Sequence, residues 1–169
     1  MNSKDLEVKG LADLGRALTT LPEKLARNVL RGALRAGAKP MLAAAKVTVH
    51  VDEGDLRDSL RISTKAKGLQ VSASVKAGGV LKGKRPVYHA HLVEYGTAAH
   101  VIEARPPHKV LAIGVARVDH PGATAAPFLR PAADAQSRTA AAATAEYIRT
   151  RLRDKHGIDV PPPAEEGDE

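Results

Sequence analysis

Small side chains limit how this chain can build a hydrophobic core. Alanine supplies 30 of the 169 residues, whereas the aromatic residues are only one Phe and three Tyr. Burial of apolar surface contributes about 25 cal/mol per Å², and alanine removes little surface from water, so a monomer would be only modestly stable. We therefore expect apolar surface to be buried against other subunits.

The chain has no Cys, which excludes disulfide bonds, thiolate zinc sites and cysteine nucleophiles.

Two helices are expected in the first third of the chain. Apolar residues recur at three- and four-residue spacing between Leu11 and Leu21, which indicates a helix. Pro22 suits the first turn of a second helix that reaches about Val47. Pro40 lies inside this second helix and should kink it or split it in two. Residues 5–9 alternate in polarity and could form a short strand.

The middle of the chain has the alternating pattern of a small antiparallel sheet. Residues 69–77 are apolar at every second position and predict a strand. Residues 61–66 are its expected hairpin partner, across a turn at 67–68. Before this hairpin, Gly54 interrupts the regular secondary structure, and Asp55 could cap a short helix that follows.

The C-terminal half is expected to hold one more strand and a long helix. Residues 109–118 are apolar on both faces and predict a buried strand. A long helix is expected from about Phe128 to Lys155, with Pro131 in its first turn. The expected apolar side of this helix consists of Ala132, Ala140, Ala143, Tyr147, Ile148 and Leu152.

The predicted fold class is α+β, with long N- and C-terminal helices packed on a small antiparallel β-sheet. A mass of 17.8 kDa suits one domain, which we place at residues 1–157. The remaining residues, 158–169, form a Pro-rich acidic ending that cannot bury apolar surface and is expected to be a flexible tail.

Positive charge is concentrated in the body of the chain. The net charge is +7, and after Lys155 there are five acidic and no basic residues, so residues 1–155 carry 26 minus 14, or +12. Five basic residues recur along one face of the second expected helix: Lys24, Arg27, Arg31, Arg35 and Lys39. Their like charges repel by roughly 0.2–0.5 kcal/mol per pair. This face is either solvated or directed at DNA or an acidic protein neighbour.

The stretch YHAHLVEYGT, residues 88–97, is unusually rich in side chains that bind metals or perform catalysis. Its candidate metal ligands are His89, His91 and Glu94, together with the nearby His100. No single regular structure presents all four together, and the HExxH motif is absent. No Ser-His-Asp order or acid–base pair of carboxylates is discernible either. We therefore predict no catalytic residue, no metal site and no cofactor.

Packing against a neighbour explains the same stretch better. Residues 88–95 can form two helical turns with Tyr88, Leu92 and Tyr95 on one side. Gly96 would end this helix in the left-handed conformation that costs glycine least. Tyr is enriched in protein interfaces, so we expect a helix that serves an interface.

Residues 78–84 imitate the start of a phosphate-binding loop, with Gly78, Gly83 and Lys84 at the right spacing. That motif requires Ser or Thr next, whereas Arg85 and Pro86 follow here. We interpret residues 78–86 as a mobile surface loop rather than a nucleotide site.

Four segments occur in the order seen in one family of phage proteins: GLADLGRALTTLPEKLARNVLRGALRAGAKPMLAAAK, VDEGDLRDSLRIS, HLVEYGT and HPGATAAPFLRPAADA. Together they resemble the HK97-type (gene-ten-like) tail-component family of long-tailed bacteriophages, also called neck, head–tail joining or tail-completion proteins. The resemblance spans about residues 8–150. The chain departs from the family pattern at His50, where Pro is usual, and at Tyr95, where Phe is frequent.

The resemblance implies a structural virion protein that is not an enzyme. Members act where the DNA-filled head meets the tail, so the implied partners are other copies in a ring, expected to be hexameric, and neighbouring stopper and tail-terminator or tail-tube proteins. Genome DNA would pass through the channel. The expected assembly residues are Tyr88, His91, Leu92, Glu94, Tyr95, Gly96, Pro127, Phe128, Leu129, Arg130 and Pro131. The basic face of Lys24, Arg27, Arg31, Arg35 and Lys39 would line the channel or meet an acidic neighbour.

A basic DNA-binding protein that acts through the Lys24–Lys39 face is the alternative to this structural role. The chain has no apolar run of the roughly 18 residues that cross a bilayer, and its first ten residues lack a signal-peptide pattern. We therefore expect no membrane partner. The expected location is the host cytoplasm during assembly and the virion neck afterwards.

Overall fold

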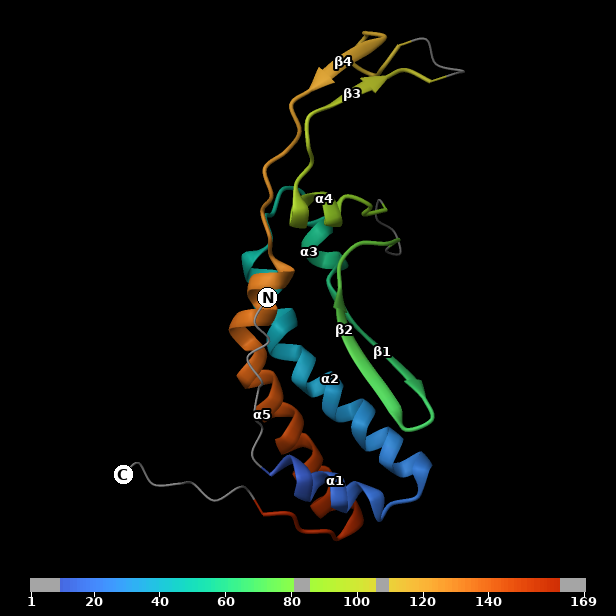
Figure 1. The fold of residues 1–169 in the computed structure, drawn as a ribbon, viewed down its shortest axis with the longest axis vertical. Helices are drawn as coiled ribbons and strands as arrows, with labels where there is room; N and C mark the ends of the chain where they lie inside the picture. The colour runs from blue at the N-terminus through green and yellow to red at the C-terminus, as the bar shows by residue number, and fades with distance from the viewer. Residues whose placement is uncertain (1–9, 81–85, 106–109, 162–169) are drawn as a thin grey trace, which may run out of the picture. The chain divides into compact units, whose positions relative to one another are not determined.

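The computed structural model describes residues 10–80, 86–105 and 110–161 (Figure 1). Its helices are α1 (Leu11–Thr19), α2 (Glu23–Thr48), α3 (Asp55–Ser59), α4 (Ala90–Tyr95) and α5 (Leu129–His156). Its strands are β1 (Arg61–Lys67), β2 (Gln70–Lys76), β3 (His100–Glu103) and β4 (Arg117–His120). The predicted α+β class is confirmed. The elements divide into two compact units, one with α1, α2, α5 and the β1–β2 hairpin, the other with α3, α4 and the β3–β4 hairpin.

The long N-terminal helix of the first unit is continuous. Of the two outcomes expected at Pro40, a split does not occur, because α2 runs through this residue from Glu23 to Thr48. A proline inside a helix costs about 3 kcal/mol. Buried positions on both sides of Pro40, at Gly37, Ala38 and Ala45, give α2 a packed face that offsets this cost.

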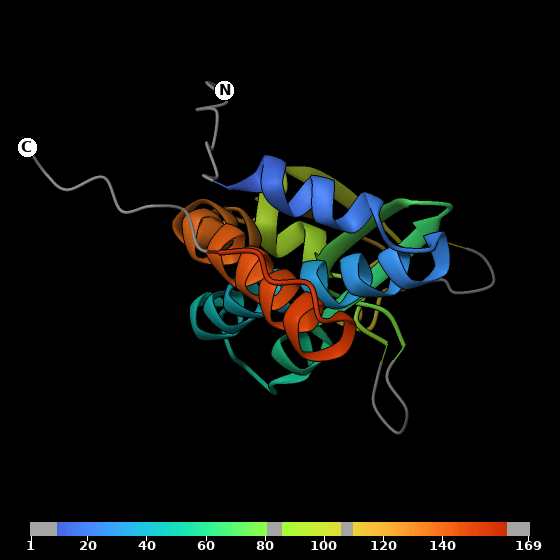
Figure 2. The same ribbon diagram turned by 90° about the horizontal axis from the view of Figure 1, so that it is seen from below.

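Helices α2 and α5 pack side by side and form the core of the first unit (Figures 1 and 2). Its buried residues are Leu14, Val29, Ala33, Ala145, Ile148, Leu152 and Val160. Glycines of α2 face α5: a Cβ on Gly32 would overlap the Tyr147 hydroxyl, and one on Gly37 would overlap the Thr144 side chain. Small residues therefore let α2 and α5 approach closely, while Leu, Val and Ile side chains fill the core between them.

The β1–β2 hairpin packs on α2 of the same unit (Figure 1). Its register pairs Arg61 with Lys76 and Lys67 with Gln70, so the turn consists of Gly68 and Leu69, one residue later than predicted. Gly68 has a φ of 58°, as the first position of a type II′ hairpin turn requires. The strand expected at 69–77 is confirmed at 70–76, with its alternate residues half-buried. Helix α2 therefore contacts both the hairpin and α5, and α5 packs chiefly against α2.

A buried serine ties the second unit together. Ser59, fully buried at the end of α3, donates a hydrogen bond to the Leu56 carbonyl (2.6 Å) and accepts one from the Gly78 N–H (2.8 Å). Beyond this link, the Gly79 and Val87 backbones pair in an antiparallel bridge with N–O distances of 2.8 and 2.9 Å. The short helix expected after Gly54 is present.

The β3–β4 hairpin corrects one prediction. Residues 109–118 were expected to form a buried strand, but β4 begins only at Arg117, and Val110, Ile113 and Val115 are 52%, 69% and 42% exposed. Lys109 itself lies outside the described residues. The apolar pattern predicts burial, yet these three side chains stay about half or more exposed in the single chain.

Several other expectations fall outside the described residues: the strand at 5–9, the central part of the 78–86 loop and the end of the acidic tail. The single domain at 1–157 stays a prediction. None of the described helices is long and apolar enough to cross a membrane.

Candidate assembly interface

Helix α4 presents large side chains outward. It begins at Ala90, later than expected, so Tyr88 precedes it, while Leu92 and Tyr95 lie three residues apart in the helix. Tyr88, Leu92 and Tyr95 are 71%, 41% and 68% exposed. Two of the three tyrosines of the chain are therefore exposed on or beside a single short helix, a placement typical of protein interfaces.

Gly96 ends α4 in a conformation that differs from the predicted one. Its φ of 71° is positive, but its ψ is −176°, which lies outside the left-handed helical region and in a region open essentially to glycine alone. A Cβ here would lie 2.6 Å from the Ala123 carbonyl oxygen. This conformation directs the chain into an antiparallel bridge, in which Thr97 and Ala123 exchange hydrogen bonds of 2.9 and 3.0 Å.

Glu94 connects two segments that the sequence presented separately. Its side chain is buried, and one carboxylate oxygen accepts a hydrogen bond from the Phe128 N–H at 2.8 Å. The Val93 carbonyl accepts another from the Ala126 N–H at 2.8 Å. Phe128 is fully buried within its own chain, although it was expected among the assembly residues. The sequence pattern placed Glu94 among interface residues and did not anticipate this internal contact.

The other expected assembly residues lie closer to the surface. His91, Pro127, Arg130 and Pro131 are exposed, and Leu129 is half-buried. Arg130 and Pro131 belong to the first turn of α5 and Pro127 precedes it, so these residues surround the buried Phe128 in sequence.

The histidines do not converge on a metal site. His89 and His91 are exposed at the start of α4, whereas His100 lies on β3 opposite His120 of β4, with ring centroids 5.0 Å apart. Each of this pair has a backbone partner: His100 Nδ1 lies 2.9 Å from the Ala98 carbonyl, and His120 Nδ1 accepts the Gly122 N–H at 3.0 Å. Among the described residues there is no group of three or more possible metal ligands.

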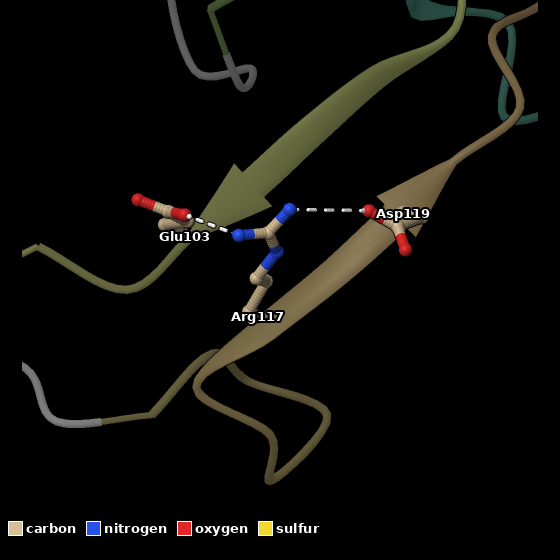
Figure 3. Close-up of polar contacts among 3 residues, drawn as sticks. All are labelled: Glu103, Arg117 and Asp119. Atoms are coloured by element: carbon tan, nitrogen blue, oxygen red, sulfur yellow. Dashed lines mark hydrogen bonds and ion pairs between the residues drawn. The ribbon is translucent and has the colours of Figure 1, made fainter.

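One surface ion pair links the two strands of the β3–β4 hairpin, and a second lies within β4. Arg117 of β4 lies between Glu103 of β3 and Asp119 of its own strand, at 3.4 and 3.8 Å (Figure 3). All three side chains are more than half exposed, and exposed ion pairs contribute only about 0–1 kcal/mol each. The arrangement stabilises the hairpin slightly and forms no reactive centre.

A groove of about 530 Å³ lies within the second unit. Three segments line it, within residues 50–56, 86–93 and 123–126. Leu56, Val87 and Leu92 contribute apolar surface, and three carboxylates line it as well, those of Asp52, Glu53 and Asp55. The volume falls in the range of roughly 300–1,000 Å³ that is usual for binding pockets.

A family model described as "Bacteriophage HK97-gp10, putative tail-component" matches residues 12–96. This match covers half of the chain, from α1 through α2 and the β1–β2 hairpin to the end of α4. The chain belongs to this family. No curated protein and no solved structure matches it. Residues 97–150, which also carry the resemblance, lie beyond the matched part.

As a member of a phage tail-component family, the chain is assigned to the virion. The basic face of this tail component is mostly open to solvent: Lys24, Arg31, Arg35 and Lys39 of α2 are exposed, and Arg27 is half-buried. Within the parts of the chain that the structure describes, none of the five forms a salt bridge. A row of unpaired positive charges on a rigid helix can meet DNA or an acidic protein surface.

Proposed function

We propose that this tail component is a structural, non-enzymatic virion protein that forms a hexameric ring in the neck of a long-tailed bacteriophage. In this position it joins the DNA-filled head to the tail, between a head-completion or stopper protein and the tail terminator or tail tube. The observation that carries the proposal is the family match over residues 12–96.

Physical features of the chain support assembly. Large apolar side chains remain exposed at two places in the second unit, around α4 and between β3 and β4. A closed ring with head-to-tail contacts would bury such surface on every subunit. Net folding stabilities are only about 5–15 kcal/mol, so this added burial would contribute a large share of total stability.

The basic face supports a position around or beside DNA. If Lys24, Arg27, Arg31, Arg35 and Lys39 line the channel, they attract the passing genome without reading its sequence. If they meet an acidic neighbour instead, they fix the orientation of the ring against the stopper or terminator. Either arrangement would also relieve the repulsion among these side chains.

A cryo-EM reconstruction of the intact neck tests the proposal. We expect one ring of six copies between head and tail, with a central channel wide enough for duplex DNA. Mass spectrometry of purified particles should detect the chain in about the same copy number. Its absence from particles, or its presence as single copies, contradicts the proposal.

The exposed basic face also favours a second function, DNA binding by the free protein. If the five basic residues neutralise five phosphates, DNA binding should weaken roughly several hundredfold when the salt concentration rises from 50 to 200 mM. The double variant Arg31→Gln, Arg35→Gln should bind more weakly with a shallower salt dependence. Lys65→Gln with Lys67→Gln, on the exposed positions of β1, is the matched control. Equal, negligible binding at both salt concentrations would eliminate this function.

A further inference from the structure

The segment between β3 and β4 holds a structured apolar turn. The Leu111 N–H donates to the Val115 carbonyl (2.7 Å), and the Gly114 N–H donates to the Leu111 carbonyl (2.8 Å). Gly114 has the positive φ of 83° that closes this turn. Ile113 lies within it and is 69% exposed. We call residues 110–116 the Ile113 turn.

The order in this turn favours its use as a ligand. A hydrogen bond from the Ala104 N–H to the Ala116 carbonyl (2.9 Å) extends the β3–β4 pairing up to the turn. A segment that is already held by its own hydrogen bonds loses little conformational freedom on binding. Exposed Val110 and Val115 flank Ile113, so one docking event can bury three branched apolar side chains.

The groove of the second unit has the complementary properties. Its volume of about 530 Å³ accommodates several such side chains, and Leu56, Val87, Leu92 and Val93 give it apolar walls. Tyr88 stands exposed beside two of the residues that line it, Val87 and His89. None of residues 110–116, which form the Ile113 turn, lines the groove of its own chain.

The charges of the two elements also match. Residues 50–56 line the groove and contain Asp52, Glu53 and Asp55 but no Lys or Arg. Residues 104–118 surround the Ile113 turn in sequence and contain Arg105 and Lys109, together with Arg117, which is paired with Glu103 and Asp119. In a chain with a basic body, this acidic segment is an unusual feature, and opposite charges favour approach in the correct orientation.

We propose that the Ile113 turn of one copy inserts into the α3–α4 groove of a second copy. Each chain carries one turn and one groove, so the contact joins different surfaces and can be repeated from copy to copy. A repeated contact of this kind produces a ring when its rotation closes. The inference deepens the proposed ring assembly and rests on it for its biological setting, while the contact itself can be measured separately.

The absence of cysteine allows a direct test by disulfide trapping. One chain carries Ile113→Cys and the other Leu92→Cys, so that no linkage within a chain is possible. The control chain carries Val47→Cys, at an apolar position of α2 that is 87% exposed. Mildly oxidised mixtures of the full-length proteins are followed over time by non-reducing electrophoresis, and the linked peptides are identified by mass spectrometry.

Docking raises the local thiol concentration to about the millimolar range, so at micromolar protein the 113–92 linkage should form at least about tenfold faster than the 47–92 linkage. Adding Val115→Asp to the Ile113→Cys chain should remove this excess, because it places a carboxylate against the acidic groove. Adding Val47→Asp instead should preserve the excess. Equal rates for the 113–92 and 47–92 pairs overturn the proposal, as does an excess that survives Val115→Asp.

Native mass spectrometry of the unmodified chain separates this proposal from the ring itself. Preferential 113–92 linkage by a chain that never forms closed oligomers, in solution or in particles, supports the docking contact and contradicts the ring. Rings that form without preferential linkage support the ring and overturn the docking contact. A double variant, Leu92→Cys with Ile113→Cys, that links within single chains at high dilution also overturns docking between copies.

Discussion

The Glu94 carboxylate accepts a hydrogen bond from the Phe128 backbone N–H at 2.8 Å, across 34 positions of sequence. Both residues are buried, Glu94 to 6% and Phe128 to 0% exposure. A buried charged acceptor gives a stronger hydrogen bond than a neutral one, and losing it in a buried setting is costly. Together with the Val93–Ala126 hydrogen bond, it holds the segment before α5 against α4.

Glu94→Ala should therefore destabilise the second unit by about 1.5–3 kcal/mol. Glu94→Gln retains an oxygen acceptor and should cost less. The measurement is amide hydrogen exchange at Phe128 by NMR, which reports this contact directly, together with urea denaturation. Glu103→Ala, at an exposed ion pair, is the control and should change stability by no more than about 0.5 kcal/mol. Equal exchange rates at Phe128 in the Glu94 and Glu103 variants would contradict the assignment.

The close approach of α2 and α5 makes a second prediction. Gly37→Ala adds a Cβ that overlaps the Thr144 side chain and lies 2.7 Å from the Ala140 carbonyl oxygen. Overpacking costs about 1–3 kcal/mol, more than the gain of about 1 kcal/mol in helix propensity, so the helix pair should lose stability. Gly15→Ala in α1 meets no atom within 4 Å and should gain up to about 1 kcal/mol. Thermal unfolding followed by circular dichroism measures both, and a stabilised Gly37→Ala chain would contradict the close approach.

Regular periodicity explains why much of the first unit could be predicted. The apolar spacing before Leu21, the residues of α5 from Ala132 to Leu152, and the alternation of residues 69–77 each reflect burial within the chain itself, and all three elements are present. The split that Pro40 made possible does not occur, because the local preference of proline for ending a helix is weaker than the packing of α2 along its length.

The candidate interface was harder to predict for two physical reasons. An apolar run such as residues 109–118 indicates burial but not whether the burying surface belongs to the same chain, so a segment exposed in the single chain was expected to be a core strand. The Glu94–Phe128 contact depends on how helix α4 meets the distant segment before α5, and no local pattern encodes it. The groove likewise draws on three separate segments and has no motif of its own.

Gly96 should be intolerant of any side chain. Gly96→Ala meets both an unfavourable backbone conformation, costing about 1–3 kcal/mol, and backbone atoms at 2.6 and 2.8 Å in Ala123 and Ala125. The expected loss is about 3–5 kcal/mol, with separation of the Thr97–Ala123 bridge. Gly114→Ala is the matched control, because Gly114 also has a positive φ but meets no atom within 4 Å. It should lose only about 1–2 kcal/mol. Urea denaturation compares the two, and similar losses would mean that the close approach at Gly96 is unimportant.

Ser59 provides the last prediction, because its long-range hydrogen bond can be separated from its local one. Its hydroxyl donates to the carbonyl three residues back, at 2.6 Å, and accepts the Gly78 N–H at 2.8 Å. Ser137 of α5 makes the same kind of local bond, to the Asp134 carbonyl at 3.2 Å, and no long-range one within the described residues. Removing a buried hydrogen-bond partner costs about 1–3 kcal/mol, so Ser59→Ala should destabilise the second unit by this amount.

Ser137→Ala should instead be neutral or slightly stabilising, because alanine has the higher helix propensity, by up to about 0.5 kcal/mol. Hydrogen exchange at the Gly78 and Gly79 amides should accelerate in the Ser59 variant and stay unchanged in the Ser137 variant. Since the segment that starts at Gly78 leads to Val87 and the groove, loosening it should also slow the 113–92 disulfide trapping. A Ser59→Ala chain with unchanged exchange at Gly78 would show that the hydroxyl does not hold this segment in solution.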